Sequence, residues 1–213
     1  MADPTPHNTT NTDPPENTNE PVMITHLKPI VELTANPDMA RVYLYFLNSD
    51  EPLTVPEFLA DHPEFTKSTA YEYVDALTTA GILTATGETD GATAYTAHEF
   101  DISFGTKDTT VRVTPDLVAV LAAQDSTDQI QPFIDQYGVG TLARFIDLAY
   151  DHADGTVTTR MISNILDIPV GQTYDILQHI TQILDIGDGP ETFTPDDIDP
   201  EERHALLDEA RET

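Results

Sequence analysis

The side chains that most often carry catalysis or hold metal ions are few and scattered in this sequence. Cysteine is absent, which excludes disulfides, thiolate zinc sites and a cysteine nucleophile. The seven histidines form no close pair with metal-ligand spacing. His98 lies beside Glu99 and Asp101 and could share a metal, but among 38 acidic residues such neighbours are expected by chance. No phosphate-binding loop or nucleophile elbow occurs either, so we expect neither an enzyme nor a bound cofactor or metal.

Recognition of DNA is the chemistry that one cluster of polar residues could perform, at the start of a helix predicted from Thr66 to about Ala80. Lys67 can neutralise a phosphate, and Tyr71 can contact a phosphate or a thymine methyl group. Ser68 and Thr69 can exchange hydrogen bonds with DNA, and Glu72 shares their surface. The alternative is that Tyr71 packs half-buried and Ser68 belongs to a helix cap.

An apolar stripe on the same helix should hold it against two preceding helices. The stripe comprises Ala70, Val74 and Leu77, joined by Tyr73 and Ala80. The first supporting helix is predicted to follow Asn36, which can act as its cap, and a shorter one is predicted over 25–34. The second supporting helix should begin at Thr54, which has capping-box spacing to Glu57.

After these helices the pattern changes to that of strands. Gly81 is a typical left-handed helix stop, and the runs 82–86 and 93–96 flank Asp90-Gly91, a strong hairpin signal. A further strand pair is predicted over 101–104 and 109–113. Three helices followed by a hairpin is the element order of a winged helix.

The second half of the chain is predicted to be mostly helical and to repeat part of the first. The expected helices cover 115–123, 127–137, 141–152, 158–166 and 170–184, with Gly138 and Gly140 as stops and a final short helix from Asp199. Three successive segments of the two halves align at an offset of about 103 residues, which favours two copies of a helix-turn-helix core. In the second copy, Gln172, Thr173 and Tyr174 occupy the positions of the candidate DNA contacts. A solvated polar face or a dimer contact is the alternative for them.

The passage from this helix into the hairpin resembles a known family. The run STAYEYVDAL at 68–77, followed by AGIL at 80–83, resembles the recognition-helix-to-wing passage of archaeal winged-helix regulators of the ArsR and TrmB type. The span from about 25 to 185 looks like a haloarchaeal family with a winged-helix domain. The resemblance implies transcriptional regulation, with the residues matching Ser68 and Tyr71 on the exposed surface of the helix.

The charge balance is extreme and points to a salty environment. Nine Lys and Arg stand against 38 Asp and Glu, for a formal charge of −29. Such self-repulsion becomes tolerable where K⁺ or other cations screen it, since the Debye length falls to about 3 Å at 1 M salt. The same acidity opposes ordinary DNA binding, because residues 37–105 contain only two basic residues, Arg41 and Lys67, and twelve acidic ones.

These observations predict a mostly α protein with small β-hairpins (α+β): an N-terminal winged helix-turn-helix followed by a second, helical, helix-turn-helix-like domain. The expected segments are a disordered acidic and polar tail (1–21), the winged domain (22–105), the second domain (106–185) and an acidic linker with a C-terminal helix (186–213). With no signal peptide or membrane span in the sequence, we expect a cytoplasmic protein. The predicted function is sequence-specific binding of double-stranded DNA as a homodimeric, salt-adapted transcriptional regulator. A winged-helix module that binds proteins instead of DNA is the alternative. A metal or small-molecule sensor within the second domain is a third possibility.

Overall fold

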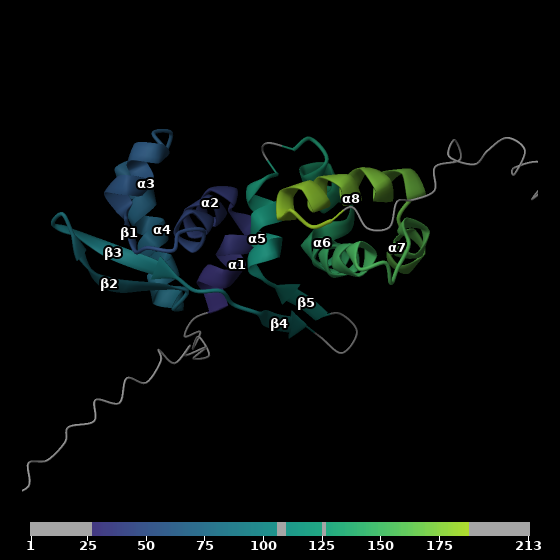
Figure 1. Ribbon diagram of the computed structural model, residues 1–213, viewed down its shortest axis with the longest axis horizontal. Coiled ribbons are helices and arrows are strands. Elements are labelled where there is room, and N and C mark those ends of the chain that lie inside the picture. The colour runs from purple at the N-terminus through teal and green to yellow at the C-terminus, as the bar shows by residue number, and fades with distance from the viewer. Residues whose placement is uncertain (1–26, 106–109, 125–126, 188–213) are drawn as a thin grey trace, which may run out of the picture.

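The structure is a computed structural model that describes residues 27–105, 110–124 and 127–187 (Figure 1). It is mostly helical with two small antiparallel sheets, which confirms the predicted α+β class. The predicted tail over 1–21, the C-terminal helix from Asp199 and nearly all of the acidic linker lie outside the described residues. In chain order the elements are α1 (Leu27–Ala35), α2 (Pro37–Leu47), β1 (Leu53–Thr54), α3 (Val55–Asp61), α4 (Lys67–Ala80), β2 (Leu83–Thr89), β3 (Ala92–Ala97), β4 (Ile102–Gly105), β5 (Thr110–Val113), α5 (Pro115–Ala122), α6 (Ile130–Ala153), α7 (Thr159–Leu166) and α8 (Val170–Leu184).

The helices of the first half begin and end where their capping residues predict. The Asn36 side chain accepts hydrogen bonds from the first turn of α2. Thr54 and Glu57 form a complete capping box at α3, and Thr66 caps α4. Gly81 ends α4 in the left-handed region, with φ of 86°, a conformation that glycine adopts without a Cβ clash. Local sequence therefore sets the position of α4.

The first sheet has the strand order β1-β3-β2 and lies beside α4. Strands β2 and β3 form a hairpin whose tip residues, Asp90 and Gly91, both have positive φ. This geometry suits a tight hairpin turn and confirms the prediction made from the Asp-Gly pair. The two-residue strand β1, between α2 and α3, pairs with the return strand β3 through Leu53–Tyr95 and Thr54–Ala94.

The second half repeats the helix order of the first without a following hairpin in the described residues. Helix α6 has a kink at Gly138, whose φ of 82° and ψ of 160° are not helical. The sequence predicted a break at this residue. Thr158 caps α7 as Thr54 caps α3. The order α6, α7, α8 thus parallels α2, α3, α4, and Tyr174 on α8 follows Tyr71 on α4 by about 103 residues.

One buried cluster connects the two halves. Helices α1 and α5 lie between the α2–α4 group and the α6–α8 group (Figure 1), and α5 packs on α2 as well as on α6 and α8. Apolar side chains from all eight helices contribute to this cluster. The predicted division after Gly105 falls inside the β4–β5 hairpin, so the two-domain organisation stays a prediction.

Candidate nucleic-acid interface

The start of α4 presents the side chains that the sequence singled out. Lys67, Ser68, Tyr71 and Glu72 are all exposed, and Tyr71 has an exposed fraction of 40%. The opposite face of the helix is buried, with Ala70, Val74 and Leu77 each at 2% exposure or less. The predicted division of α4 into a packed stripe and a free face is confirmed.

Two of these exposed residues contact each other. The Lys67 ammonium lies 5.7 Å from the centre of the Tyr71 ring, which is within range of a cation–π interaction. Within the described residues Lys67 makes no ion pair with a carboxylate. Because no carboxylate in that part of the chain pairs with it, the Lys67 ammonium is available to bind an anionic partner.

The helix cap involves Thr69 and leaves Ser68 outside it. The Thr66 hydroxyl accepts a hydrogen bond from the Thr69 amide at 3.2 Å, and the two hydroxyls lie 2.8 Å apart. Thr69 is half-buried, so its hydroxyl serves the cap first and would have to exchange that partner to contact DNA. The capping alternative considered for Ser68 is not what the structure shows, because the cap contact joins Thr66 and Thr69.

The surroundings of this face are acidic. Glu72 and Asp75 are exposed on α4 itself, and Glu88 and Asp90 are exposed near the tip of the β2–β3 hairpin. Lys67 is the one lysine or arginine in the sequence between Leu53 and Ala97. Contact with a polyanion would bring Glu72 and Asp75 near phosphates, and a hairpin that acted as a wing would do the same for Glu88 and Asp90. Such proximity costs free energy unless cations screen or bridge the charges.

The second unit, which comprises α6, α7 and α8, presents only part of its predicted face. The prediction for Thr173 is wrong. Thr173 is fully buried, and its hydroxyl donates to the Pro169 carbonyl at 3.1 Å. Consecutive helical residues are separated by about 100° of rotation, so three in a row cannot share one face. Gln172 is half-buried and accepts a hydrogen bond from the Tyr137 hydroxyl at 2.9 Å. Tyr174, at 44% exposure, is the predicted residue that remains free.

The candidate metal residues are engaged elsewhere. His98 Nε2 lies 2.9 Å from the Thr84 hydroxyl, and Asp101 binds Arg112. In the three ranges that the structure describes, no group of three or more histidine and acidic side chains is arranged to hold a metal ion.

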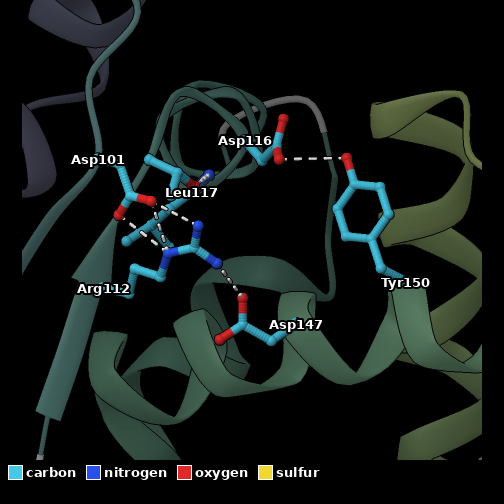
Figure 2. Close-up of polar contacts among 7 residues, drawn as sticks. Asp101, Arg112, Asp116, Leu117, Asp147 and Tyr150 are labelled. Carbon is cyan, nitrogen blue, oxygen red and sulfur yellow. Dashed lines mark hydrogen bonds and ion pairs between the residues drawn. The ribbon is translucent and has the colours of Figure 1, made fainter. Parts of the chain in front are cut away.

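An ion-pair network that the sequence did not reveal joins the β4–β5 hairpin to α6 (Figure 2). Arg112 on β5 donates from Nε to Asp101 at 2.9 Å and from Nη1 to Asp147 on α6 at 3.4 Å. Its hydrogen bonds hold the pKa of Asp101 below the usual range of an aspartate. Nearby, the Tyr150 hydroxyl on α6 donates to Asp116 on α5 at 3.1 Å, and burial raises the pKa of Tyr150. These contacts connect the β4–β5 hairpin and α5 to α6.

A further feature missed from the sequence is two pairs of exposed apolar side chains on the second unit. Met161 and Ile165 on α7 are each 45% exposed, and Val170 and Tyr174 on α8 are 40% and 44% exposed. Each pair is separated by four residues and so lies on one side of its helix. Exposed apolar side chains of this size suit contact with another protein.

Comparison with known proteins assigns no activity to the chain. Residues 124–188 match the model of a family described as a family of unknown function (DUF7437). The matched stretch contains α6, α7 and α8, whereas α2, α3 and α4 lie outside it. No curated protein and no solved structure matches the chain. Across the described residues, no helix combines the length and hydropathy needed to cross a bilayer.

Proposed function

We propose that residues 37–97 form a winged helix-turn-helix that binds double-stranded DNA and that the protein is a transcriptional regulator. The support for this fold is the order α2-β1-α3-α4-β2-β3, together with the strand order β1-β3-β2. In such an arrangement α4 takes the place of the recognition helix and the β2–β3 hairpin that of the wing. The proposal agrees with the resemblance of residues 68–83 to archaeal regulators.

The observation that carries the proposal is the exposed start of α4. A recognition helix enters the major groove with its N-terminal residues near the base edges. Lys67, Ser68 and Tyr71 lie there, opposite the buried stripe, and Lys67 is held against Tyr71 at 5.7 Å. In this proposal Lys67 neutralises a phosphate, while Ser68 and Tyr71 contact bases or phosphates; Thr69 and Glu72 flank them.

The net charge of −29 requires that binding take place in high salt. Counterion release, which drives most DNA binding, fades as salt rises, so fit to the groove and direct contacts must supply the affinity. Screening at about 1 M salt confines charge repulsion to roughly 3 Å, which makes the acidic hairpin tip tolerable near phosphates. We therefore propose a salt-adapted cytoplasmic protein for which K⁺ is the screening ion.

We further propose a homodimer formed through the second unit. The supporting observation is the exposed apolar surface of Met161, Ile165, Val170 and Tyr174. A two-fold dimer would place two copies of α4 on half-sites of a palindromic operator. This surface lies on α7 and α8, so it leaves α4 free.

A second candidate function rests on the charge of the same helix and hairpin. Glu72, Asp75, Glu88 and Asp90 would attract a basic protein surface more readily than a phosphate backbone. In that case the winged helix serves as a docking module, and replacement of the acidic residues would abolish binding.

Selection of bound fragments from random duplex DNA in multimolar KCl tests the proposal. The test variant is Lys67→Ala combined with Tyr71→Ala. Its matched control is Arg144→Ala, which removes a cation from an exposed position of α6 outside both the proposed DNA contact and the proposed dimer surface.

We expect the wild type and the control to enrich the same palindromic motif. Loss of base-contacting groups costs about 1 to 3 kcal/mol each, so the test variant should bind that motif at least tenfold more weakly. Failure of the folded wild type to enrich any motif would refute DNA binding. In that event, salt-sensitive capture of a basic protein that depends on Glu72 and Asp75 would support the docking module.

A further inference from the structure

A small pocket lies in the second unit where the end of α6, the start of α7 and one side of α8 meet. Its volume is about 230 Å³, and its lining includes His152, Thr159, Tyr174 and Thr181. This volume corresponds to several water molecules, at about 30 Å³ each, and is below the range of drug-sized ligand sites. It suits a small metabolite.

Thr159 has a buried hydroxyl without a partner. The residue is 1% exposed, and its Oγ1 makes no hydrogen bond. The corresponding position in the first unit shows what packing alone requires there. Val55 is likewise the first residue of a helix capped by threonine, and it is also 1% exposed. Because valine and threonine have nearly the same shape, a valine could fill the position of Thr159 equally well. Packing therefore does not explain the hydroxyl.

An unsatisfied buried hydroxyl costs about 1–3 kcal/mol, which Thr159 does not recover from any protein group. A hydroxyl in this position is useful if something in the pocket binds it. Buried polar atoms in native proteins nearly always have a partner, and those without one in the protein are candidates for contact with a ligand or an ordered water.

His152 adds a second unpartnered polar atom to the pocket. The ring is 3% exposed, and its Nδ1 lies 2.9 Å from the Val157 carbonyl oxygen. A carbonyl can only accept, so Nδ1 carries the proton and a neutral ring leaves Nε2 as an acceptor. Within the described residues Nε2 has no hydrogen-bond partner. Thr181 uses its own proton on the Gln178 carbonyl at 3.0 Å, so its oxygen is also an acceptor.

The charges of the residues that line the pocket indicate which class of ligand it could bind. No lysine or arginine lines the pocket, whereas the exposed carboxylate of Asp175 lies at its rim. The Tyr174 ring, which also lines it, can stack against a cation. Leu177 and Gln178 complete the lining, and the Gln178 amide can both donate and accept hydrogen bonds. Because the lining has a carboxylate and an aromatic ring but no cationic side chain, it suits a ligand with N–H donors and positive charge.

We propose that this pocket, built by His152, Thr159, Tyr174 and Asp175, binds a small organic cation that carries an amino or guanidino group. The hydroxyl of Thr159 and Nε2 of His152 hydrogen-bond the ligand at the base of the pocket, and Asp175 pairs with its charge at the rim. All of these residues belong to the second unit, so the site does not depend on DNA binding by α4.

Titration of the full-length protein with methylguanidinium and with agmatine tests the proposal. The readouts are the ring ¹⁵N signals of histidine and the melting temperature, both in KCl at a concentration that keeps the protein folded. Butyrate serves as an anionic probe of similar size. The variants are Thr159→Val, which removes the unpartnered hydroxyl without changing shape, and Thr159→Ser, which keeps it. Thr173→Val is the matched control, because it removes a buried hydroxyl that is already bonded to Pro169.

We expect a saturable shift of the His152 Nε2 signal with the guanidinium probes and none with butyrate. Thr159→Val should weaken binding by about fivefold to tenfold, the loss of one hydrogen bond, while Thr159→Ser and Thr173→Val bind as the wild type does. The unliganded protein should melt at the same or a higher temperature after Thr159→Val and at a lower one after Thr173→Val. Three results would overturn the proposal: no saturable shift in the folded wild type, which would mean that the pocket holds water only; preference for butyrate; or unaltered binding by Thr159→Val.

Discussion

The network around Arg112 provides a quantitative test of how the β4–β5 hairpin is held against α6. Replacement of Arg112 by Met keeps an unbranched side chain and removes the hydrogen bonds to Asp101 and Asp147. All three side chains are about half exposed, at 50%, 53% and 51%. Exposed ion pairs contribute about 0.2–1 kcal/mol each, and a two-point arginine–carboxylate pair lies near the top of that range.

The loss should therefore be about 1 kcal/mol of unfolding free energy, which lowers the melting temperature of a chain of this size by roughly 2–4 °C. Arg144→Met is the matched control, because Arg144 is an exposed arginine of α6 without an ion pair among the described residues. Thermal unfolding followed by circular dichroism measures both variants, with Asp101→Asn and the double variant completing a mutant cycle.

The pH dependence of the mutant cycle tests whether the stabilisation by Arg112 comes from its pairing with Asp101. Because its pKa is lowered in the folded state, its stabilisation is present above the ordinary aspartate pKa of about 4 and is lost as pH falls through the lowered value. The wild type and Arg112→Met should thus converge in strongly acidic buffer. A coupling energy near zero at neutral pH, or one that persists in acid, would refute the role given to this pair.

Three further predictions concern the first unit and the charge of the chain. Thr54→Ala removes the capping box of α3, in which Thr54 Oγ1 and Glu57 lie 2.7 Å apart, and should cost about 1–2 kcal/mol in denaturant unfolding; a change below a few tenths would contradict it. Burial and the hydrogen bond to Asp61 raise the pKa of Tyr45 to about 12, so ultraviolet titration against Tyr45→Phe should show one tyrosine that ionises late. The stabilisation from the Tyr45–Asp61 hydrogen bond is lost as pH rises through the raised pKa. Ionisation of Tyr45 near pH 10 would contradict this hydrogen bond. Dialysis into dilute buffer should abolish the helical circular dichroism because the charge of −29 loses its screening, and full retention would refute that account of the acidity.

The elements were largely predictable because their ends depend on local chemistry. Asn36, Thr54 and Thr66 cap helices by short-range hydrogen bonds, and Gly81 adopts a backbone conformation that few other residues tolerate. The exposure of Lys67 and Tyr71 followed from the apolar stripe on the same helix, whose spacing fixes which face is packed.

The parts that were missed depend on contacts between distant segments. Arg112 meets Asp147 only after β5 packs on α6, and the pocket beside Thr159 exists only once three helices converge. One signal for it was available: alignment of the two halves places Thr159 opposite Val55, a polar residue where the first copy has an apolar one. The wrong assignment of Thr173 could also have been avoided, because the same alignment places it opposite the buried Ala70.

The central claim, that the start of α4 lies against DNA, can be measured directly because the chain has no cysteine. Ser68→Cys creates a single thiol on α4, to which an iron chelate that cleaves DNA can be attached. Asp151→Cys on α6 places the same chelate at another exposed position. With a duplex that carries the selected motif in multimolar KCl, we predict strong cleavage from position 68 and little from position 151. Equal cleavage from both positions, or none from either while the protein is folded, would contradict the account.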